Sequence, residues 1–484
     1  MIVYKFGGAT TRTARGLATL VSLVGATHKI EAAKTRREKG DSAARYGLVL
    51  VVSAIGHTTR HLHQAAEHSS HGDTLLAEES LETVMRQQED LLRSLKLSSE
   101  ANAKIAAGFE AIHQEIRLLL EGIAITRELS LRTRDLVISA GERFASLLIG
   151  SLLVESGIPV HRIDSRELIV TNEEFGNAKP LKEEIVDRCA KLVLPALQSS
   201  EVVLVEGFVG ATLDGVTTTM GSESSDLTAT LIGASLHAKE IVIWKSVAGI
   251  FNADPELVPE ARLLPKLSFA ESAEIGRRGA RILFETAVEP LISLGDSALL
   301  RIASPTSAAR SGVIGRRSTT IAPTNGAKLR VSKPLALVLD GRLVAVRIKP
   351  KASDRVQQAL ADTPLKKKLR QEKYDLVRQS TIYSVTNELD TYLVLHRDAK
   401  ETLLAELQGY FEIIEEPSVA ALSLVIRNPL APKASNLDQL RSEFLRSLKG
   451  IPVIAIFNAG ESIVALIEEG SAVASLRKVF RTIF

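Results

Sequence analysis

Lys5, Gly7 and Gly8 stand at the start of the chain in a spacing suited to holding a phosphoryl group. Ile2–Phe6 is apolar enough to form a short buried strand that ends directly before the glycines. Glycine has no Cβ, so backbone N–H groups at such a turn can approach an anion closely. A helix is predicted over Thr10–Val24, and a helix N-terminus attracts negative charge. The motif favours phosphate binding, although Gly-Gly after a strand is more often a simple tight turn.

Two further junctions carry polar side chains. Val52 ends an apolar run and is followed by a Ser/Gly/Thr loop that could hold a ligand, although Thr58 or Thr59 there could equally cap a helix. Leu136–Ser139 is predicted to be a strand, which places Glu142 in the first turn of the next helix. A glutamate in that position more commonly pairs with the helix dipole than binds a ligand.

Two later segments are also candidates. Asp226 follows a hydroxyl-rich loop and opens a predicted helix, which Asp226 or Ser225 could cap. Asp226 could instead hold Lys5 in place or take part in metal coordination. The irregular loop over Lys245–Pro255 follows a predicted strand, and Arg281 lies between apolar residues. An ordinary surface loop and an ordinary snorkelling arginine are the simpler explanations for these two.

These junctions need a scaffold that brings strand ends together. Apolar runs of strand length alternate with amphipathic stretches to about residue 315, a pattern typical of a mainly parallel sheet with helices on both faces. We therefore expect a three-layer α/β/α domain. Other strands are predicted at Gly47–Val52, Val160–Ile163, Val202–Glu206, Glu240–Trp244 and Ser297–Ile302, and helices at Glu142–Glu155 and Ser225–Leu236, with an antiparallel helical hairpin formed by Leu75–Leu95 and Ala101–Leu120.

The polar, turn-rich residues 317–335 predict a linker between a first domain, 1–316, and a second region, 336–484. The second region reads as two small α+β units of the βαββαβ type. Strands are predicted at Leu335–Leu339, Leu343–Ile348, Thr381–Val385, Thr391–Leu395, Ala420–Ile426, Ile451–Phe457 and Ser462–Ile467, with a turn at Asp340-Gly341 and helices at Ser353–Leu360, Ala399–Tyr410, Asn436–Leu448 and Ala472–Ile483.

Composition limits the kind of partner. The 484 residues carry 60 basic and 57 acidic side chains, a net charge of +3, which gives no reason to expect a nucleic-acid partner. Cys189 is the only cysteine, which excludes an intrachain disulfide and fits a reducing compartment. No signal pattern opens the chain, and no apolar run reaches the roughly 18 residues that span a bilayer. We expect a cytoplasmic protein without a membrane partner.

Taken in order, these motifs resemble those of aspartate kinases in the amino-acid kinase family. The family's Lys-Phe-Gly-Gly-Thr-Ser is matched by Lys5–Thr10, and its Val-Ser-Ala-Met-Gly by Val52–Gly56. Its Arg-Thr-Arg-Asp-Leu-Val-Leu-Ser-Phe-Gly-Glu-Arg is nearly reproduced at Arg132–Arg143. Its Gly-Phe-Ile-Gly and Thr-Thr-Leu-Gly motifs are matched at Gly207–Gly210 and within Thr217–Gly221. The resemblance covers about residues 1–316 and is weak beyond them.

The resemblance implies that the γ-phosphoryl group of ATP moves to the side-chain carboxylate of L-aspartate, with Mg²⁺ bridging the phosphates. This would be the first step towards lysine, threonine and methionine. It implies catalytic roles for Lys5 and Asp226, with no protein metal ligands. The implied substrate-binding residues are Ala9, Thr10, Glu142, Ser222 and Ser225, and the implied nucleotide-binding residues are Lys5, Gly7, Gly8, Ser246, Phe251, Asn252, Asp254, Pro255 and Arg281. A C-terminal pair of ACT domains, a possible amino-acid effector and a homodimer or larger homo-oligomer are also implied.

The chain departs from the family at several of these positions. The family's Gly-Arg-Gly-Gly-Ser-Asp becomes Gly221–Asp226, so Ser222 stands where an arginine would clamp the substrate α-carboxylate. Ser246 replaces an aspartate expected near the nucleotide, and Arg281 replaces a usual lysine. Two alternatives therefore remain open. The protein could be a non-catalytic relative that binds a nucleotide or an amino acid, or a kinase for another acidic substrate.

Overall fold

The computed structural model describes residues 1–37, 47–199, 201–280, 282–283, 285–293, 298–311, 317–323, 333–350, 383–386, 391–396, 411–427, 437–459 and 462–484. The chain forms two compact units. Unit 1 consists of Met1–Ile250, Leu263–Phe269 and Thr286–Pro323, and unit 2 consists of Phe251–Arg262, Ala270–Glu285 and Thr324–Phe484. Two stretches of the predicted first domain therefore belong to unit 2, and the predicted domain boundaries themselves stay a prediction.

Unit 1 is built on an eight-stranded sheet in the order β3-β4-β2-β1-β7-β9-β10-β8. Its strands are β1 (Ile2–Phe6), β2 (Leu48–Val52), β3 (Val160–Ile163), β4 (Val202–Glu206), β7 (Glu240–Trp244), β8 (Lys266–Ser268), β9 (Leu299–Ala303) and β10 (Ser318–Ala322), and a separate hairpin pairs β5 (Val209–Ala211) with β6 (Thr217–Thr219). Neighbouring strands run parallel except β9 and β10. The predicted mainly parallel α/β class is confirmed, and part of the predicted linker forms β10.

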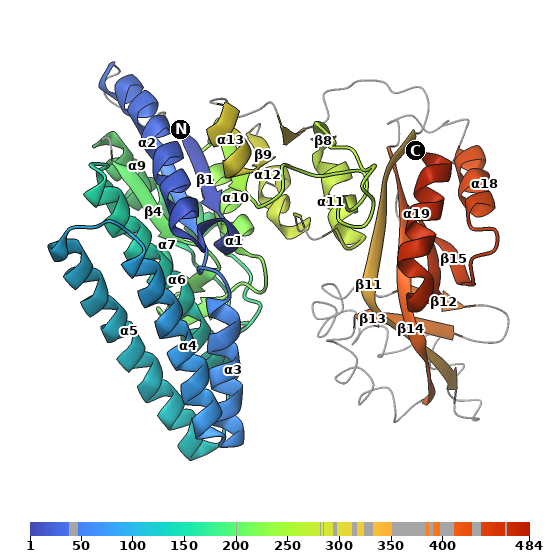
Figure 1. Ribbon diagram of the computed structural model, residues 1–484, viewed down its shortest axis with the longest axis horizontal. Coiled ribbons are helices and arrows are strands. Elements are labelled where there is room, and N and C mark those ends of the chain that lie inside the picture. The colour runs from blue at the N-terminus through green and yellow to red at the C-terminus, as the bar shows by residue number, and fades with distance from the viewer. Residues whose placement is uncertain are drawn as a thin grey trace. The chain divides into compact units, whose positions relative to one another are not determined.

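Helices cover both faces of this sheet (Figure 1). The described helices of unit 1 are α1 (Gly8–Thr11), α2 (Ala14–Arg37), α3 (Thr58–His71), α4 (Thr74–Arg93), α5 (Ser99–Thr126), α6 (Leu131–Glu155), α7 (Ser165–Leu168), α8 (Lys182–Arg188), α9 (Leu194–Gln198), α10 (Ser225–Ser235), α12 (Glu289–Ser293) and α13 (Pro305–Ser311). A π-helical turn lies at Cys189–Val193, and a 3-10 turn at Glu285–Ala287 begins at the last residue of a unit 2 segment. Helices α4 and α5 pack together as the predicted hairpin, alongside α3.

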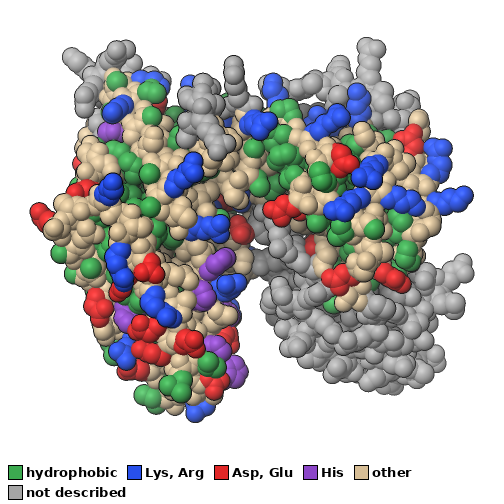
Figure 2. All heavy atoms as spheres, in the orientation of Figure 1, with side chains coloured by type: hydrophobic (Ala, Val, Ile, Leu, Met, Phe, Trp, Pro, Cys, Tyr) green, Lys and Arg blue, Asp and Glu red, His purple; other side chains and the backbone are tan. Residues whose placement is uncertain are grey.

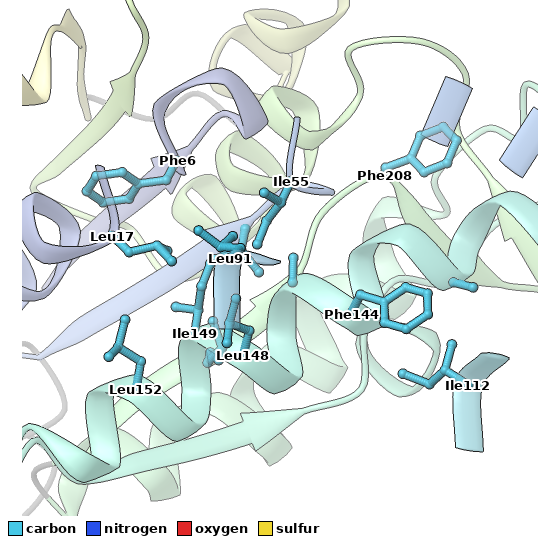
Figure 3. Close-up of a cluster of buried hydrophobic side chains, with 14 of the residues drawn as sticks. Phe6, Leu17, Ile55, Leu91, Ile112, Phe144, Leu148, Ile149, Leu152 and Phe208 are labelled. Carbon is cyan, nitrogen blue, oxygen red and sulfur yellow. The ribbon is translucent and has the colours of Figure 1, made fainter. Parts of the chain in front are cut away.

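Strand β1 shows how the two faces differ. Tyr4 and Phe6 lie in a buried apolar cluster with Leu17 of α2 and Leu148 of α6 (Figure 3). Because successive side chains of a strand point to opposite faces, Lys5 points to the other face. Helix α10 packs against β1, β2 and β7 there. The alternation of β1 therefore directs a lysine towards α10.

Helix α6 corrects one prediction. Leu136–Ser139 is not a strand but the second turn of this long helix, and Glu142 lies well inside the helix rather than in its first turn. Ser130 caps the start, since its hydroxyl accepts the N–H of Thr133 at 3.1 Å. Helix α6 is also long and apolar enough to cross a membrane, but 72% of its most apolar window is buried inside the protein, as in a core helix. A short apolar run does not distinguish a buried helix from a buried strand.

The helix predicted over Thr10–Val24 also differs in detail. The chain enters the short helix α1 directly at Gly8, breaks at Arg12 and Thr13, and continues as α2. The Thr10 hydroxyl donates a hydrogen bond to the Gly7 carbonyl at 2.6 Å. This bond holds the turn between β1 and the helices.

Unit 2 contains a six-stranded sheet in the order β12-β13-β11-β14-β16-β15, whose neighbours are all antiparallel. Its strands are β11 (Lys333–Pro350), β12 (Tyr383–Thr386), β13 (Thr391–His396), β14 (Phe411–Arg427), β15 (Val453–Ala459) and β16 (Ser462–Glu468), and its helices are most of α11 (Phe269–Arg277), α18 (Leu437–Ser447) and α19 (Ala472–Ile483), with a 3-10 turn at Glu469–Ser471. A separate sheet of this kind is consistent with ACT-like units.

The predicted turn at Asp340-Gly341 is wrong, because β11 continues through it as one strand. The pairing with β14 shifts register between Asp340 and Leu343, so the strand absorbs the turn-forming residues as an irregularity. The helices predicted at Ser353–Leu360 and Ala399–Tyr410 lie outside the described residues.

Candidate active site

Lys5 and Asp226 form a buried ion pair at the carboxyl edge of the unit 1 sheet. The Lys5 ammonium lies 2.7 Å from Oδ1 of Asp226, and both side chains are at least 96% buried. Asp226 belongs to the first turn of α10, whereas the N-cap position is Ser224. The capping role considered for Asp226 is therefore wrong, because its carboxylate is turned to the lysine instead.

A second lysine contacts the same carboxylate. The Lys245 ammonium lies 2.8 Å from Oδ2 of Asp226 and 3.6 Å from Glu223. The sequence predictions named the neighbouring Ser246 and missed Lys245. The signal was present, since Ile241, Ile243 and Lys245 share one face of β7 and its extension, the face that Lys5 occupies on β1.

The electrostatics of this group follow from burial and mutual attraction. Burial alone would raise the pKa of Asp226, but the charges of Lys5 and Lys245 outweigh it and hold that pKa below its ordinary value. Burial alone would lower the pKa of Lys245, but Asp226 and Glu223 outweigh it and raise that pKa. Asp226 is therefore an anion and Lys245 a cation at neutral pH.

The two positions after β1 differ in why they are occupied by glycine. A Cβ on Gly8 would lie 2.0 Å from the Ala54 carbonyl oxygen, so only glycine fits this close approach to the loop after β2. A Cβ on Gly7 would meet the Trp244 oxygen at 3.6 Å and the Lys5 ammonium at 3.7 Å, which are ordinary contacts. Gly8 shapes the turn, whereas Gly7 leaves space beside the ammonium of Lys5.

Glu142 reaches the same edge of the sheet from α6, on the opposite face. Its Oε1 accepts the backbone N–H of Ala54 at 3.1 Å, and among the described residues its buried Oε2 has no hydrogen-bond partner. Burial raises the pKa of Glu142 to about 8. A buried carboxyl group with a free oxygen is suited to receive a cationic group of a ligand.

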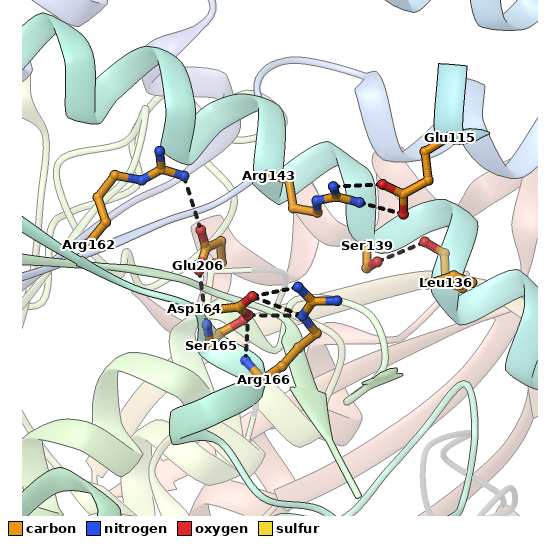
Figure 4. A network of polar contacts seen from close by, with 9 residues as sticks. All are labelled: Glu115, Leu136, Ser139, Arg143, Arg162, Asp164, Ser165, Arg166 and Glu206. Carbon is orange, nitrogen blue, oxygen red and sulfur yellow. Dashed lines mark hydrogen bonds and ion pairs between the residues drawn. The ribbon is translucent and has the colours of Figure 1, made fainter. Parts of the chain in front are cut away.

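Neighbouring polar contacts hold the loops around this edge. Asp135 of α6 accepts the N–H groups of Gly176 and Thr219 at 2.8 and 2.9 Å and the Thr219 hydroxyl at 2.6 Å. Glu206, at the end of β4, accepts the N–H of Ser165 at 3.0 Å (Figure 4). Burial raises the pKa of both carboxyl groups, although the hydrogen bonds oppose this shift. These two residues fix backbone segments rather than face the Lys5 pair.

The smaller predicted residues fall into two groups. Ser225 is buried against Gly207, where a Cβ would lie 2.5 Å from the Cβ of Ser225. Ala9, Ser222 and Ser246 are exposed. Ser222 therefore offers a hydroxyl to solvent at the position where the family resemblance expects an arginine.

Several of the residues predicted to bind the nucleotide do not belong to unit 1. Phe251, Asn252, Asp254 and Pro255 belong to unit 2, where the Asn252 carbonyl accepts the N–H of Leu337 at 2.8 Å. Arg281 lies outside the described residues. The basic residues Arg277 and Arg278 both pair with Glu274 within unit 2.

Metal-ligating side chains do not cluster in the described part of the chain. Histidines gather along α3 (Figure 2), but no group of three His, Cys, Asp or Glu residues among the described ones could hold an ion. Each oxygen of Asp226 already contacts a lysine. Among the described residues no cluster of side chains could hold an ion by itself, so a Mg²⁺ ion there would need the phosphates of a ligand as further ligands.

Comparison with known proteins adds relatives of one kind. The chain is 34% identical to aspartokinase 2, chloroplastic, of Arabidopsis thaliana over 245 residues, which cover 50% of this chain and 44% of that protein. It is 34% identical to lysine-sensitive aspartokinase 3 of Escherichia coli (strain K12) over 186 residues, 37% of this chain and 41% of that one. The chain spans less than half the length of these curated relatives.

Solved structures share the fold over the whole chain. E. coli aspartokinase III in complex with aspartate and ADP (R-state) superimposes with a TM-score of 0.80 at 23% identity, covering 100% of both chains. The same enzyme in complex with lysine and aspartate (T-state) gives a TM-score of 0.70 at 22% identity, covering 100% of this chain and 99% of that one. The model of the amino acid kinase family matches residues 1–301. The predicted resemblance is thereby confirmed, and the chain belongs to the amino acid kinase family.

Proposed function

We propose that the protein is an aspartate kinase, a phosphotransferase that uses ATP to phosphorylate the side-chain carboxylate of L-aspartate. An oxygen of that carboxylate attacks the γ-phosphorus, the bond to the β–γ bridging oxygen breaks, and ADP leaves with the electron pair. The observation that carries the proposal is the buried Lys5–Asp226 ion pair beside the Gly7 turn. Glu142 at the same edge supplies a buried carboxyl group that can receive a cationic group of the substrate.

The residues suit this reaction because it needs positioning and charge stabilisation more than proton transfer. A carboxylate nucleophile is already ionised at neutral pH, so no general base is required. Lys5 would contact the transferring phosphoryl group and offset its developing negative charge. Asp226 would hold Lys5 in position, since its own low pKa makes it a poor proton carrier.

Glu142 would hold the α-ammonium group of the amino acid. Its Oε2 is buried without a hydrogen-bond partner among the described residues, and a bound ammonium would supply one. Such an opposite charge also lowers the raised pKa of Glu142, because it favours the ionised form. Binding of the substrate would thus be coupled to release of a proton from Glu142.

The other sequence-based assignments belong to the same proposal. ATP with Mg²⁺ would bind through the turn after β1 and the predicted residues Ser246, Phe251, Asn252, Asp254, Pro255 and Arg281. Ala9, Thr10, Ser222 and Ser225 would line the amino-acid side. Unit 2 would provide an ACT-like regulatory pair with an amino-acid effector, in a homodimer or larger homo-oligomer located in the cytoplasm. The proposed catalytic domain, linker and regulatory region are residues 1–316, 317–335 and 336–484.

The decisive experiment is ATP turnover by the purified full-length protein with Mg²⁺ and L-aspartate. Hydroxylamine in the assay traps an acyl phosphate as a hydroxamate, which identifies the carboxylate as the acceptor. The proposal predicts aspartate-dependent ADP release that Lys5→Ala abolishes. Nucleotide binding without turnover on any acidic amino acid would indicate a non-catalytic relative. Turnover with L-glutamate and not L-aspartate would indicate a kinase for another substrate.

A further inference from the structure

We infer that Lys245 is a second phosphoryl-binding cation, which forms with Lys5 a two-lysine clamp on the terminal phosphates of the nucleotide. Asp226 holds both ammonium groups together, one at each carboxylate oxygen. The inference rests on the proposed kinase function for the identity of the anion. The pairing of the two lysines through one carboxylate is a property of the site itself.

The position of Lys245 follows from the sheet. Strands β1 and β7 are parallel neighbours, and Lys5 is in register with Ile243. Lys245 is two residues beyond Ile243 and so lies on the same face, one step further towards the carboxyl edge. The N–H of Gly7 donates to the carbonyl oxygen of Trp244 at 3.2 Å, which ties the phosphoryl turn to the residue before Lys245. Lys245 therefore flanks the turn on the β7 side.

The charge balance of the group favours an anionic ligand. Lys5, Asp226 and Lys245 together carry a net charge of +1, which only the half-exposed Glu223 offsets, at 3.6 Å from Lys245. Burying a second ammonium group is costly unless its remaining donors are satisfied. Among the described residues Lys245 has only one other partner, Glu223, at 3.6 Å, which is longer than a hydrogen bond. The ammonium of Lys245 thus keeps donor capacity for an incoming phosphoryl oxygen.

Glu223 carries a mark of functional constraint. Its backbone has a φ of 62°, in the left-handed region that non-glycine residues seldom adopt. The family resemblance places a glycine at this position. Its side chain is half exposed and loosely paired with Lys245, so a phosphate can displace it. We assign Glu223 as a weak counter-ion that competes with the nucleotide for Lys245.

An anionic oxygen near Lys245 could also come from the α-carboxylate of the amino acid, because Ser222, which replaces the expected arginine, is adjacent to Glu223. The placement of Lys245 beside the Gly7 turn favours the phosphate. The two sources give different results when binding of nucleotide is measured in the absence of amino acid.

The test compares Lys245→Met with Lys239→Met in the full-length protein. Lys239 is exposed and directly precedes β7, so its substitution removes the same charge at the opposite end of the same strand. Titration calorimetry with ADP, a non-hydrolysable ATP analogue and AMP measures binding without turnover. We expect Lys245→Met to weaken the affinity for ADP and for the analogue by about 10- to 100-fold, because a charged hydrogen bond to a terminal phosphate is lost. The affinity for AMP should fall by less than about twofold. Lys239→Met should leave all three unchanged.

Two further variants keep the test decisive if Lys245→Met folds poorly. Lys245→Arg retains the cation and should keep ADP affinity within about fivefold, and Glu223→Gln removes the competing anion and should tighten ADP binding about two- to fivefold at low salt. Wild-type ADP affinity in Lys245→Met, or unchanged affinity in Glu223→Gln, would overturn the inference. A variant that raises only the KM for the amino acid would overturn it in favour of the α-carboxylate. Because ADP binding does not require aspartate as substrate, failure of the proposed function would appear separately in the turnover assay.

Discussion

Lys5 and Lys245 lie on neighbouring parallel strands and contact opposite oxygens of the single carboxylate of Asp226. Lys5 and Asp226 are buried and Lys245 is partly buried, so each charge depends on the others to offset the cost of removing it from water. This dependence makes the group a determinant of stability as well as a candidate phosphoryl site.

Replacement of Asp226 should therefore destabilise the fold. In Asp226→Asn the two lysines lose their shared counter-charge, and we expect the free energy of unfolding to fall by about 3 kcal/mol, in the range found for broken buried ion pairs. Urea denaturation followed by circular dichroism measures the loss. Glu223→Gln is the matched control, because it removes a half-exposed partner of Lys245 and should change stability by less than about 1 kcal/mol. Equal stability of the two variants would contradict this account.

Replacement of Lys5 should remove activity more than nucleotide binding. We expect Lys5→Met to lower kcat by at least about 100-fold, because an ammonium aimed at developing charge acts mainly in the transition state. Steady-state kinetics with ATP and L-aspartate give the value, and Lys239→Met provides the control for loss of one surface charge. A Lys5→Met enzyme that retains kcat while its KM for ATP rises would assign Lys5 to ground-state binding only.

The two glycines of the turn should respond differently to alanine. Gly8→Ala places a Cβ 2.0 Å from the Ala54 oxygen, so we expect it to lower the free energy of unfolding by about 2 kcal/mol or more. Gly7→Ala meets only ordinary contacts and should fold, but its methyl group lies beside the Lys5 ammonium and should reduce turnover. Thermal unfolding and turnover measured on the same preparations separate the two effects. The reverse order of stabilities would show that the turn is shaped differently.

Glu142 should make stability depend on pH. Burial raises the pKa of Glu142 in the folded protein to about 8 from its ordinary value of 4.5, so the folded state retains the proton over that interval. The contribution of Glu142 to stability is fully present below its pKa in the unfolded protein and is lost as the pH rises through its pKa in the folded protein. The free energy of unfolding of the wild-type protein should therefore fall as the pH rises from about 5 to 9. We expect Glu142→Gln to reduce this fall by a few kcal/mol, because it removes the titrating group. Urea unfolding of both proteins across this range tests it, and parallel pH profiles would contradict the raised pKa.

The scaffold of the site could be predicted because its signals are local. The strands Val160–Ile163, Val202–Glu206 and Glu240–Trp244 have the predicted bounds. In the last two, four consecutive apolar residues of strand length mark the strand in the sequence itself. The close approach of Lys5 to Asp226 was one of several roles that the sequence left open for Asp226, and the family resemblance implied it.

The errors have equally specific causes. Leu136–Ser139 is apolar because α6 is buried between the sheet and other helices, and tertiary burial leaves no helical period in so short a run. Asp340-Gly341 has turn-forming residues, but cross-strand pairing with β14 keeps β11 extended. Lys245 was missed because the family resemblance assigns the nucleotide-side role to Ser246, whereas the alternation of β7 places Lys245 on the face that Lys5 occupies on β1.

The segment Phe251–Arg262 leaves and rejoins unit 1 at one place, where the N–H of Leu264 bonds the carbonyl of Ile250 at 2.8 Å. Its Ala253 and Val258 are buried in the apolar core of unit 2 with Leu337 and Phe444. A protein shortened to residues 1–316 would keep the segment Phe251–Arg262 but lose Leu337 and Phe444, which bury its apolar side chains. Such a fragment would expose a hydrophobic loop to solvent and would tend to aggregate. Experiments on either unit are therefore better carried out on the intact polypeptide.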